Sequence, residues 1–169
     1  MLSLLVAPAG WGSSNDFECP GSPAYVHASA RVQALASATC DDVRAEMLAR
    51  VGGQFDTWHD PHNNGTYSSN TSASPAALSF SRLTGNRKYT DKMTFTFADA
   101  GNGQCSLLGC SESQVTSILD FGTNYCNLRA LYCGTAEGCK TVEHDFSAAE
   151  VKVKTSTGAK HDMALCLTV

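Results

Sequence analysis

Apolar residues recur with a helical period in one segment of the chain, residues 39–51. Four of them fall on one helix face: Val43, Met47, Leu48 and Val51. Thr39 is placed to cap the first turn, and Gly52-Gly53 is placed to end the last one. Because the apolar stripe would face the core, we expect the charged residues between its positions to point toward solvent: Arg44, Glu46 and Arg50.

Apolar and polar residues alternate on both sides of Gly85-Asn86, which is typical of two strands joined by a turn. A glycine at the first position of a two-residue loop favours a type II′ turn. With this turn Leu78 lies opposite Met93, and the apolar positions of both strands share one face. A slip by one residue would place Leu78 opposite Thr94 and divide that face, so the sequence favours the first register.

The same register makes one end of the predicted inner face polar. Phe80 then lies opposite Asp91, and Arg82 lies opposite Tyr89, close to the turn. One interpretation is that the hairpin tip extends beyond the core and that these groups are solvated. The other is a concave pocket whose floor carries a carboxylate, a guanidinium and a phenol.

Further alternation predicts additional strands toward the C-terminus. They are a short strand at 105–110 and strands at 115–121, 151–154 and 163–167. Two segments stay ambiguous, because 26–38 combines alternation with many alanines and because Ser113 could cap a helix over 115–121. One helix followed by antiparallel strands predicts an α+β fold, with one main helix packed on a curved antiparallel sheet.

This order of elements, over roughly residues 40 to 121, resembles the cystatin-like and nuclear-transport-factor-like architecture. In that architecture the sheet forms a cone whose mouth often holds a binding site, so the resemblance implies a site at the open end of the sheet. The cystatin inhibitory motif Q-x-V-x-G is missing from this chain. Inhibition of cysteine proteases is therefore not expected.

Eight cysteines are spread along the chain: Cys19, Cys40, Cys105, Cys110, Cys126, Cys133, Cys139 and Cys166. The tightest pair, Cys105 and Cys110, has the marginal zinc spacing C-x4-C, and the chain has no C-x-x-C redox motif. An even number of cysteines at these spacings predicts a disulfide framework in an oxidising compartment, with buried free thiols as the alternative. The sequence does not choose among the many possible pairings.

Two N-glycosylation sequons support a secretory route. They are Asn64-Gly65-Thr66 and Asn70-Thr71-Ser72, both inside a polar stretch where an exposed acceptor is expected. Residues 1–12 contain a short apolar run followed by small residues, and we expect either a signal-peptide remnant or a frayed terminus there. Residues 13–169 then form a single disulfide-rich domain that is secreted or lies in the lumen of the secretory pathway.

Composition and charge narrow the classes of partner. The chain has 169 residues, of which 43% are hydrophobic and 17% charged, and its formal net charge is -4. This composition is too apolar for a disordered chain, and the mild acidity argues against a nucleic-acid partner, which needs clustered positive charge. No apolar run approaches the length of a membrane span. We also expect no cofactor.

The irregular segment from Trp58 to Tyr67 carries the densest candidate chemistry. His59 and His62, with Asp60 between them, could ligate a metal ion. The alternative is a loop whose aromatic residues anchor it while its histidines are solvated. The chain has no G-x-S-x-G motif that would mark a nucleophilic serine.

Aromatic residues beside amides and carboxylates would suit a glycan or a peptide, and a second loop of this kind is predicted at 122–127. These tyrosines could instead be half-buried core residues. We therefore predict a binding domain for a small ligand, a glycan or a protein partner. The alternatives are a small secreted hydrolase or metal-dependent enzyme, using the 59–62 loop or the Arg82/Tyr89/Asp91 patch, and a surface component without a pocket. The candidate ligand-binding residues are Trp58, His59, Asp60, His62, Tyr67, Arg82, Tyr89, Asp91, Asn124 and Tyr125.

Overall fold

The computed structural model describes residues 17–70, 77–158 and 161–168. Two of the sequence predictions fall partly or wholly outside these ranges. The signal-peptide remnant or frayed terminus at residues 1–12 is one of them. The other is the second sequon, of which only Asn70 is described.

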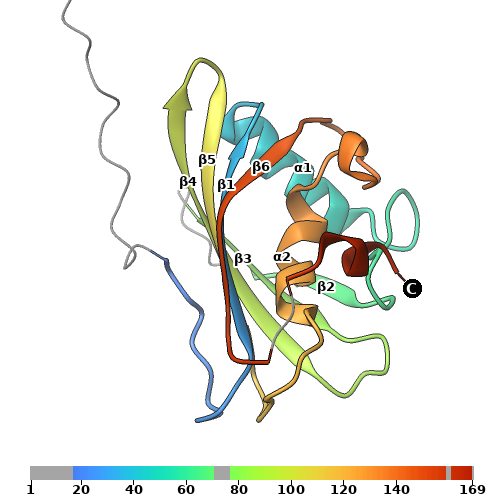
Figure 1. The fold of residues 1–169 in the computed structure, drawn as a ribbon. Helices are drawn as coiled ribbons and strands as arrows, with labels where there is room; N and C mark the ends of the chain where they lie inside the picture. Colours follow the sequence, from blue (N-terminus) through green and yellow to red (C-terminus); the bar gives the residue numbers. More distant parts are fainter. Residues whose placement is uncertain (1–16, 71–76, 159–160, 169) are drawn as a thin grey trace, which may run out of the picture.

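The described residues form a six-stranded antiparallel sheet with the order β2-β3-β4-β5-β1-β6 (Figure 1). Its strands are β1 (Ser29–Ala36), β2 (Thr66–Ser69), β3 (Ala77–Leu83), β4 (Thr90–Gly101), β5 (Gln104–Ser113) and β6 (Ala148–Thr155). The described part of the chain also contains two α-helices, α1 (Cys40–Gly52) and α2 (Thr123–Tyr132). The predicted α+β class is confirmed, with a second helix that the pattern did not predict.

Both helices pack against the same face of the sheet (Figure 1). Alternate residues of the central strands point toward them, and Val32 of β1, Phe80 of β3 and Phe95 of β4 are completely buried there. Burying one such side chain contributes about 1.5–3 kcal/mol to stability. The ambiguous segment 26–38 is thus resolved as a strand whose small alanines lie on the buried face.

The boundaries of α1 agree with the prediction. The Oγ1 atom of Thr39 accepts a hydrogen bond from the backbone N–H of Asp42 at 3.2 Å, and Gly53 follows the last turn as its cap. Val43 and Met47 are buried as expected, whereas Leu48 at the edge of the stripe is 43% exposed.

The expected solvent position of Glu46 and Arg50 is wrong, because both side chains are completely buried. Arg50 donates to Glu46 at 2.7 Å and to the backbone carbonyls of Ala130 and Cys133 at 2.9 and 2.8 Å. These carbonyls lie at the end of α2, where a helix leaves acceptors without partners. The buried guanidinium therefore satisfies backbone acceptors at the C-terminal end of α2. Arg44, the third of these residues, is only partly buried.

Glu46 completes this arrangement on its other side. Its carboxylate accepts hydrogen bonds from three successive backbone N–H groups, those of residues 142, 143 and 144, at 2.9, 2.7 and 2.8 Å. Burial by itself would raise the pKa of Glu46, but these N–H groups and Arg50 outweigh it and lower the pKa below its usual value. The ion pair thus joins α1 to α2 and to the chain that follows α2.

The β3–β4 register differs from the prediction by two residues. Leu78 lies opposite Phe95, Phe80 opposite Met93, and Arg82 opposite Asp91. The turn is longer than two residues because the side chain of Asn86 accepts from the hydroxyl of Thr84 and from the N–H of Lys88. A shift of two keeps every side chain on its predicted face, since the faces of a strand alternate with a period of two.

Three predicted segments adopt other structures. The stretch 115–121 is an irregular segment rather than a strand, and 122–127 is the beginning of α2 rather than a loop. The predicted strand at 163–167 is a 3-10 helix, η2 (Met163–Leu167), because the side chain of Asp162 caps its first turn. The short strand at 105–110 extends over the whole of β5.

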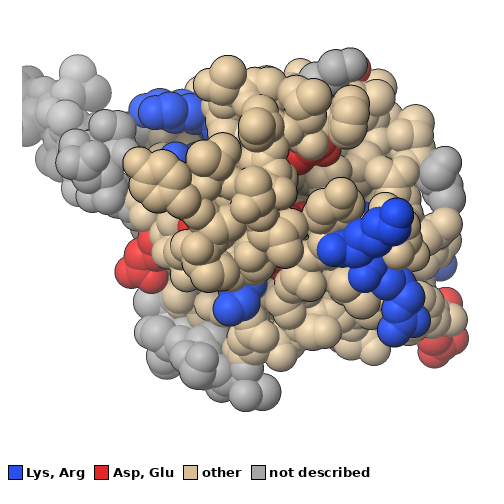
Figure 2. All heavy atoms as spheres, turned by 90° about the horizontal axis from the view of Figure 1, so that it is seen from below, with Lys and Arg blue, Asp and Glu red and all other residues tan. Residues whose placement is uncertain are grey.

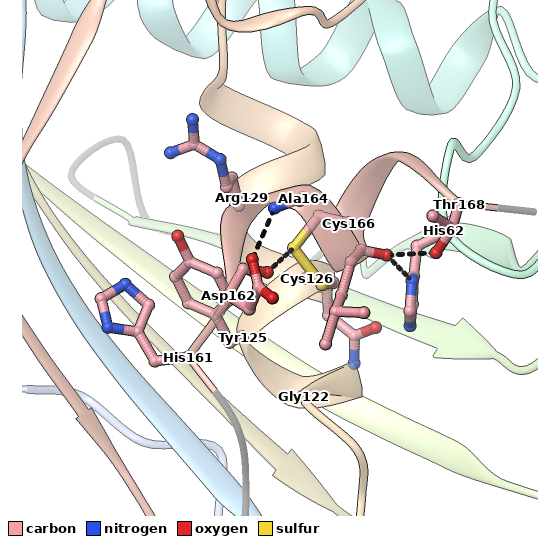
Figure 3. The surroundings of a disulfide bond; sticks show 12 residues. His62, Gly122, Tyr125, Cys126, Arg129, His161, Asp162, Ala164, Cys166 and Thr168 are labelled. Carbon is pink, nitrogen blue, oxygen red and sulfur yellow. Dashed lines mark hydrogen bonds between the residues drawn. A yellow bond between two sulfur atoms is a disulfide. The ribbon is translucent and has the colours of Figure 1, made fainter.

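All eight cysteines form disulfides, as predicted: Cys19–Cys110, Cys40–Cys105, Cys126–Cys166 and Cys133–Cys139. The first two attach the N-terminal arm and the start of α1 to β5. The third holds η2 on α2 (Figure 3). Disulfides of this kind form and persist in oxidising environments.

Among the described helices, none combines the length and the apolar character that crossing a membrane requires.

Candidate functional site

A cavity of about 710 Å³ opens at the end of the sheet where β3 and β5 finish and β4 begins. Its walls come from residues 63–64, from the β3–β4 turn and from the segment 113–123. Figure 2 views the molecule from this end, and the surface near its centre consists mostly of uncharged residues, with acidic atoms visible in recesses. The volume lies within the range of about 300–1,000 Å³ that is usual for small-molecule sites.

The cavity brings together Arg82, Tyr89 and Asp91, the three residues of the predicted polar patch. Arg82 and Asp91 are buried and face each other across β3 and β4, so they form the floor. Tyr89 lies at the turn and is 45% exposed, so it belongs to the rim. The hairpin tip therefore does not simply extend into solvent.

Arg82 is held in place by the loop at residues 58–67. Its Nε and Nη2 atoms donate to the same carboxylate oxygen of Asp60, at 2.9 and 2.5 Å, and Nη2 also donates to the backbone carbonyl of His62. The carboxylate of Asp60 accepts in addition from the N–H groups of His62 and Gly65. Asp60 is thus engaged in fixing the loop and the guanidinium, and it is not a free ligand for a metal ion.

Three buried side-chain atoms in or behind this floor have no hydrogen-bond partner among the described residues: Arg82 Nη1, Asp91 Oδ1 and, from a residue that does not line the cavity, Asn127 Oδ1. Two of these residues are hydrogen-bonded to each other, because Nδ2 of Asn127 donates to the other carboxylate oxygen of Asp91 at 2.8 Å. Burial raises the pKa of Asp91 above its usual value, against the hydrogen bonds from Ser113 and Asn127 that lower it. A buried polar atom without a partner costs about 1–3 kcal/mol, and none of these three atoms is accessible to solvent.

One side of the rim is apolar, which the sequence pattern did not predict. Ile118, Leu119 and Phe121 line it and are 64%, 61% and 68% exposed. The segment is fixed by Ser117, which precedes these residues and whose hydroxyl accepts from the N–H of Ala28, and by Asp120, whose carboxylate accepts from the N–H of Gly122. The turn-forming sequence Asp120-Phe121-Gly122 was the signal against a strand here.

The structure does not bring His59 and His62 together as metal ligands. His59 is exposed, whereas His62 is buried. In the described residues one group of three side chains meets the distance requirement for a metal site, Cys19, Cys110 and Glu112, and its two cysteines form a disulfide. The 59–62 loop therefore supplies no metal centre in this structure.

Both ring nitrogens of His62 are occupied by protein groups. Nδ1 lies 2.8 Å from the carbonyl of Leu165, which can only accept, so Nδ1 carries the proton. Nε2 then accepts from the side-chain amide of Asn63 at 3.0 Å. Figure 3 shows His62 beside the C-terminal segment that the Cys126–Cys166 disulfide holds on α2.

This arrangement predicts that stability decreases in mild acid. Burial lowers the pKa of His62 below 6.5, more than the Leu165 carbonyl raises it, so the unfolded chain binds a proton more readily than the folded one. The free energy of unfolding should therefore fall as the pH drops below about 6.5, by at most about 1.4 kcal/mol per pH unit for this one proton. The measurement is urea unfolding between neutral pH and the acid range.

His62→Asn removes the titrating ring and retains a donor for the Leu165 carbonyl. We expect a flatter pH dependence for this variant than for the natural chain. His59→Asn is the control, because His59 lies in the same loop and is exposed. Equal slopes for His62→Asn and the natural chain would contradict the assignment.

Four other predicted recognition residues lie in the core: Trp58, Tyr67, Asn124 and Tyr125. The rings of Trp58 and Tyr67 pack edge to face at 5.7 Å, and the Tyr67 hydroxyl donates to the carbonyl of Asn127. Asn124 contacts β5, because its Oδ1 atom accepts a hydrogen bond from the hydroxyl of Ser111 at 2.7 Å. All four side chains are packed in the core, so the three aromatic rings among them present no face to solvent.

A second polar cluster surrounds Glu150 of β6 and lies apart from the cavity. Its carboxylate accepts from the hydroxyls of Tyr125 and Tyr132 and from the guanidinium of Arg129, at 2.7–2.9 Å. Burial and the carboxylate together raise the pKa of both tyrosines, so their hydroxyls stay protonated as donors. The His161 ring packs against Tyr125 at 4.6 Å (Figure 3). Every member of the cluster has a partner, which indicates a structural role.

The first sequon lies at the same cavity. Asn64 is exposed and lines the cavity, in a left-handed backbone conformation with φ of 50°. The backbone N–H of Gly65 donates to Asp60 at 2.7 Å, which fixes the turn. Asn70 of the second sequon is partly buried.

Comparison with known proteins adds no relative. No protein-family model, no curated protein and no solved structure matches this chain. The function is therefore argued from the cavity and its side chains.

Proposed function

We propose that the protein is a secreted binding domain, stabilised by disulfides, that takes a small amphipathic molecule into the cavity at the end of its sheet. The observation that carries this proposal is the combination of a cavity of about 710 Å³ with polar lining residues and exposed apolar side chains along one side of its rim. Accessible polar side chains of the lining, such as Tyr89, would bind a polar group of the ligand, and its apolar part would lie against Leu119 and Phe121. The disulfides and the sequon at Asn64 support passage through the secretory pathway.

The shape and lining of the site favour a small molecule over the other two predicted partner classes. A protein partner needs a broad complementary surface, whereas this site is a cavity of about 710 Å³. A glycan needs exposed aromatic faces, and three of the aromatic residues proposed for that role, Trp58, Tyr67 and Tyr125, are buried. Of the two predicted enzyme sites, the 59–62 loop does not bring its histidine and aspartate side chains together as metal ligands among the described residues.

Binding through the apolar rim can be tested with a reporter. The protein is produced by secretion from eukaryotic cells, and its intact mass before and after glycosidase treatment reports the occupancy of the sequons. We expect the apolar dye anilinonaphthalene sulfonate to bind, and n-octanol to displace it. The Leu119→Ser/Phe121→Ser double variant should weaken n-octanol binding about ten- to hundredfold, because it removes two apolar contacts worth about 1.5–3 kcal/mol in total.

The matched control is Leu48→Ser, which changes an exposed leucine of α1 that does not line the cavity. Both variants alter exposed side chains, so their unfolding midpoints should stay close to that of the natural chain. An octanol affinity that is equal in the two variants would refute a site at this rim. Failure of n-octanol to displace the dye would also count against the proposal.

A further inference from the structure

Exposed apolar side chains gather at the end of the molecule where the cavity opens. Six of the twelve exposed large apolar side chains among the described residues lie there: Tyr25, Val26, Val115, Ile118, Leu119 and Phe121. They come from the N-terminal arm and from the segment 113–123, which lie side by side because the N–H of Ser117 donates to the carbonyl of Val26 at 3.2 Å. Exposed apolar side chains that gather in this way mark an interaction surface.

The exposed charges at this end are positive. The turn 84–89 lines the cavity through residues 84–86 and 89, and it carries Arg87 and Lys88, which are both exposed. The segments 24–27, 84–89 and 113–123 are described completely, and their one acidic residue, Asp120, is only 9% exposed. Figure 2 shows basic side chains around the uncharged surface at this end. Although the whole chain carries a net charge of -4, this end complements an anionic surface.

A lipid bilayer fits these features better than a protein partner does. A protein interface needs close shape complementarity over a broad area, whereas this surface is interrupted by a cavity and built from irregular segments. A bilayer adapts to uneven apolar side chains, and its anionic headgroups attract basic residues beside them. Tyr25 and Tyr89 are also exposed at this end, and tyrosine is favoured at the boundary between lipid and water.

A second copy of the chain is a poor occupant for a different reason. In a two-fold dimer the same end of both molecules would meet. Arg87 and Lys88 would then approach an end whose exposed charges have the same sign. The three described segments 24–27, 84–89 and 113–123 offer no exposed carboxylate that could pair with them.

We infer that this end of the molecule docks on a lipid bilayer that carries anionic headgroups. The apolar side chains of the arm and of the segment 113–123 enter the interfacial region, and Arg87 and Lys88 contact the headgroups. The cavity then opens toward the bilayer, so an amphipathic ligand passes between the two without crossing water. This passage rests on the proposed function, whereas the docking itself needs no ligand.

The test measures flotation of the secreted protein with vesicles, without any added ligand. One vesicle contains equal parts of phosphatidylcholine and phosphatidylglycerol, and the other contains phosphatidylcholine alone. We expect the anionic vesicle to bind about thirtyfold more tightly, since two basic residues contact its headgroups. Raising the salt concentration should remove most of this preference, because salt screens exposed charges.

Arg87→Gln/Lys88→Gln tests the basic part of the surface. Neither residue lines the cavity. We expect this variant to lose most of the preference for the anionic vesicle. Lys140→Gln/Lys152→Gln is the matched control, because both lysines are exposed, lie outside the three segments and give the same change in net charge.

Tyr25→Ser/Val26→Ser tests the apolar part. These side chains do not line the cavity either, so displacement of the dye by n-octanol should stay unchanged. Binding to the anionic vesicle should weaken about tenfold, because two apolar side chains no longer enter the lipid. The control is Leu48→Ser/Phe55→Ser, which changes two exposed apolar side chains outside the three segments.

The outcomes separate this inference from the proposed function. If neither vesicle binds the natural chain, the docking is refuted, and a dimer in analytical ultracentrifugation would then identify a second copy as the occupant. Equal binding to both vesicles would refute the anionic partner. Neither result affects the proposed function, which depends on displacement of the dye by n-octanol without vesicles. Vesicle binding without such displacement would support the docking and refute the proposed function. The comparison of vesicles uses the natural chain, so a variant that does not fold leaves this decision intact.

Discussion

Reduction of the four disulfides is expected to unfold the protein in buffer without denaturant. Three of them join residues 91, 65 and 40 positions apart. In the chain-entropy model, each such link destabilises the unfolded state by about 4–5 kcal/mol. A domain of ordinary stability has only about 5–15 kcal/mol in total, so the loss of several links removes the margin that keeps it folded. The measurement is circular dichroism with and without dithiothreitol at neutral pH.

The Cys133→Ser/Cys139→Ser variant is the control for this experiment. These cysteines are only 6 positions apart, so the same model assigns their disulfide about 2 kcal/mol. We expect the oxidised variant to stay folded and to unfold when the remaining disulfides are reduced. A reduced natural chain that keeps its cooperative thermal transition would show that the core and the buried ion pairs alone maintain the fold.

Features that depend on local periodicity could be predicted from the sequence. The N-cap of α1 at Thr39 and its C-cap at Gly53 follow from capping rules that concern neighbouring residues only. The faces of β3 and β4 also follow, because the alternation of side chains survives a shift of two residues in register. The shift itself could not be predicted, since it depends on hydrogen bonds that the side chain of Asn86 makes within the turn.

The second helix was missed because almost none of its surface faces solvent, although it contains polar residues such as Asn127 and Arg129. Its residues from Asn124 to Tyr132 are all buried, and Gly122 precedes it without a side-chain cap. A helix that is buried on all sides lacks the periodic contrast on which amphipathic recognition relies. The charged pair of α1 was misplaced for a related reason, because its partners lie 80 to 98 residues further along the chain.

The candidate site was predictable in part. Arg82 and Asp91 were placed on one inner face together with Tyr89, and all three line the cavity. The pairing of Arg82 with Asp60 could not be inferred, because it joins two segments whose relation the fold alone determines. Residues 115–121 were predicted as a strand, with a helix as the alternative, because alternation does not distinguish a strand from an irregular segment that carries exposed apolar residues.

The ion pair between α1 and α2 leads to the second large effect. Glu46→Ala is expected to lower the free energy of unfolding by about 3–5 kcal/mol, because it leaves the buried Arg50 without its counter-charge. The measurement is equilibrium unfolding in urea. Glu143→Ala is the control, since Glu143 is an exposed carboxylate whose own backbone N–H donates to Glu46. Its effect should stay within about 0.5 kcal/mol.

Replacing both members of the pair separates two explanations of the effect. An isolated buried ion pair can often be exchanged for apolar residues of similar volume without loss of stability. Here the pair also serves three backbone N–H groups and two carbonyls, which Glu46→Leu/Arg50→Met would leave without partners inside the protein. We therefore expect the double variant to remain at least as unstable as Glu46→Ala. Recovery of the natural stability would mean that the charges interact mainly with each other, and that the end of α2 and residues 142–144 do not depend on them.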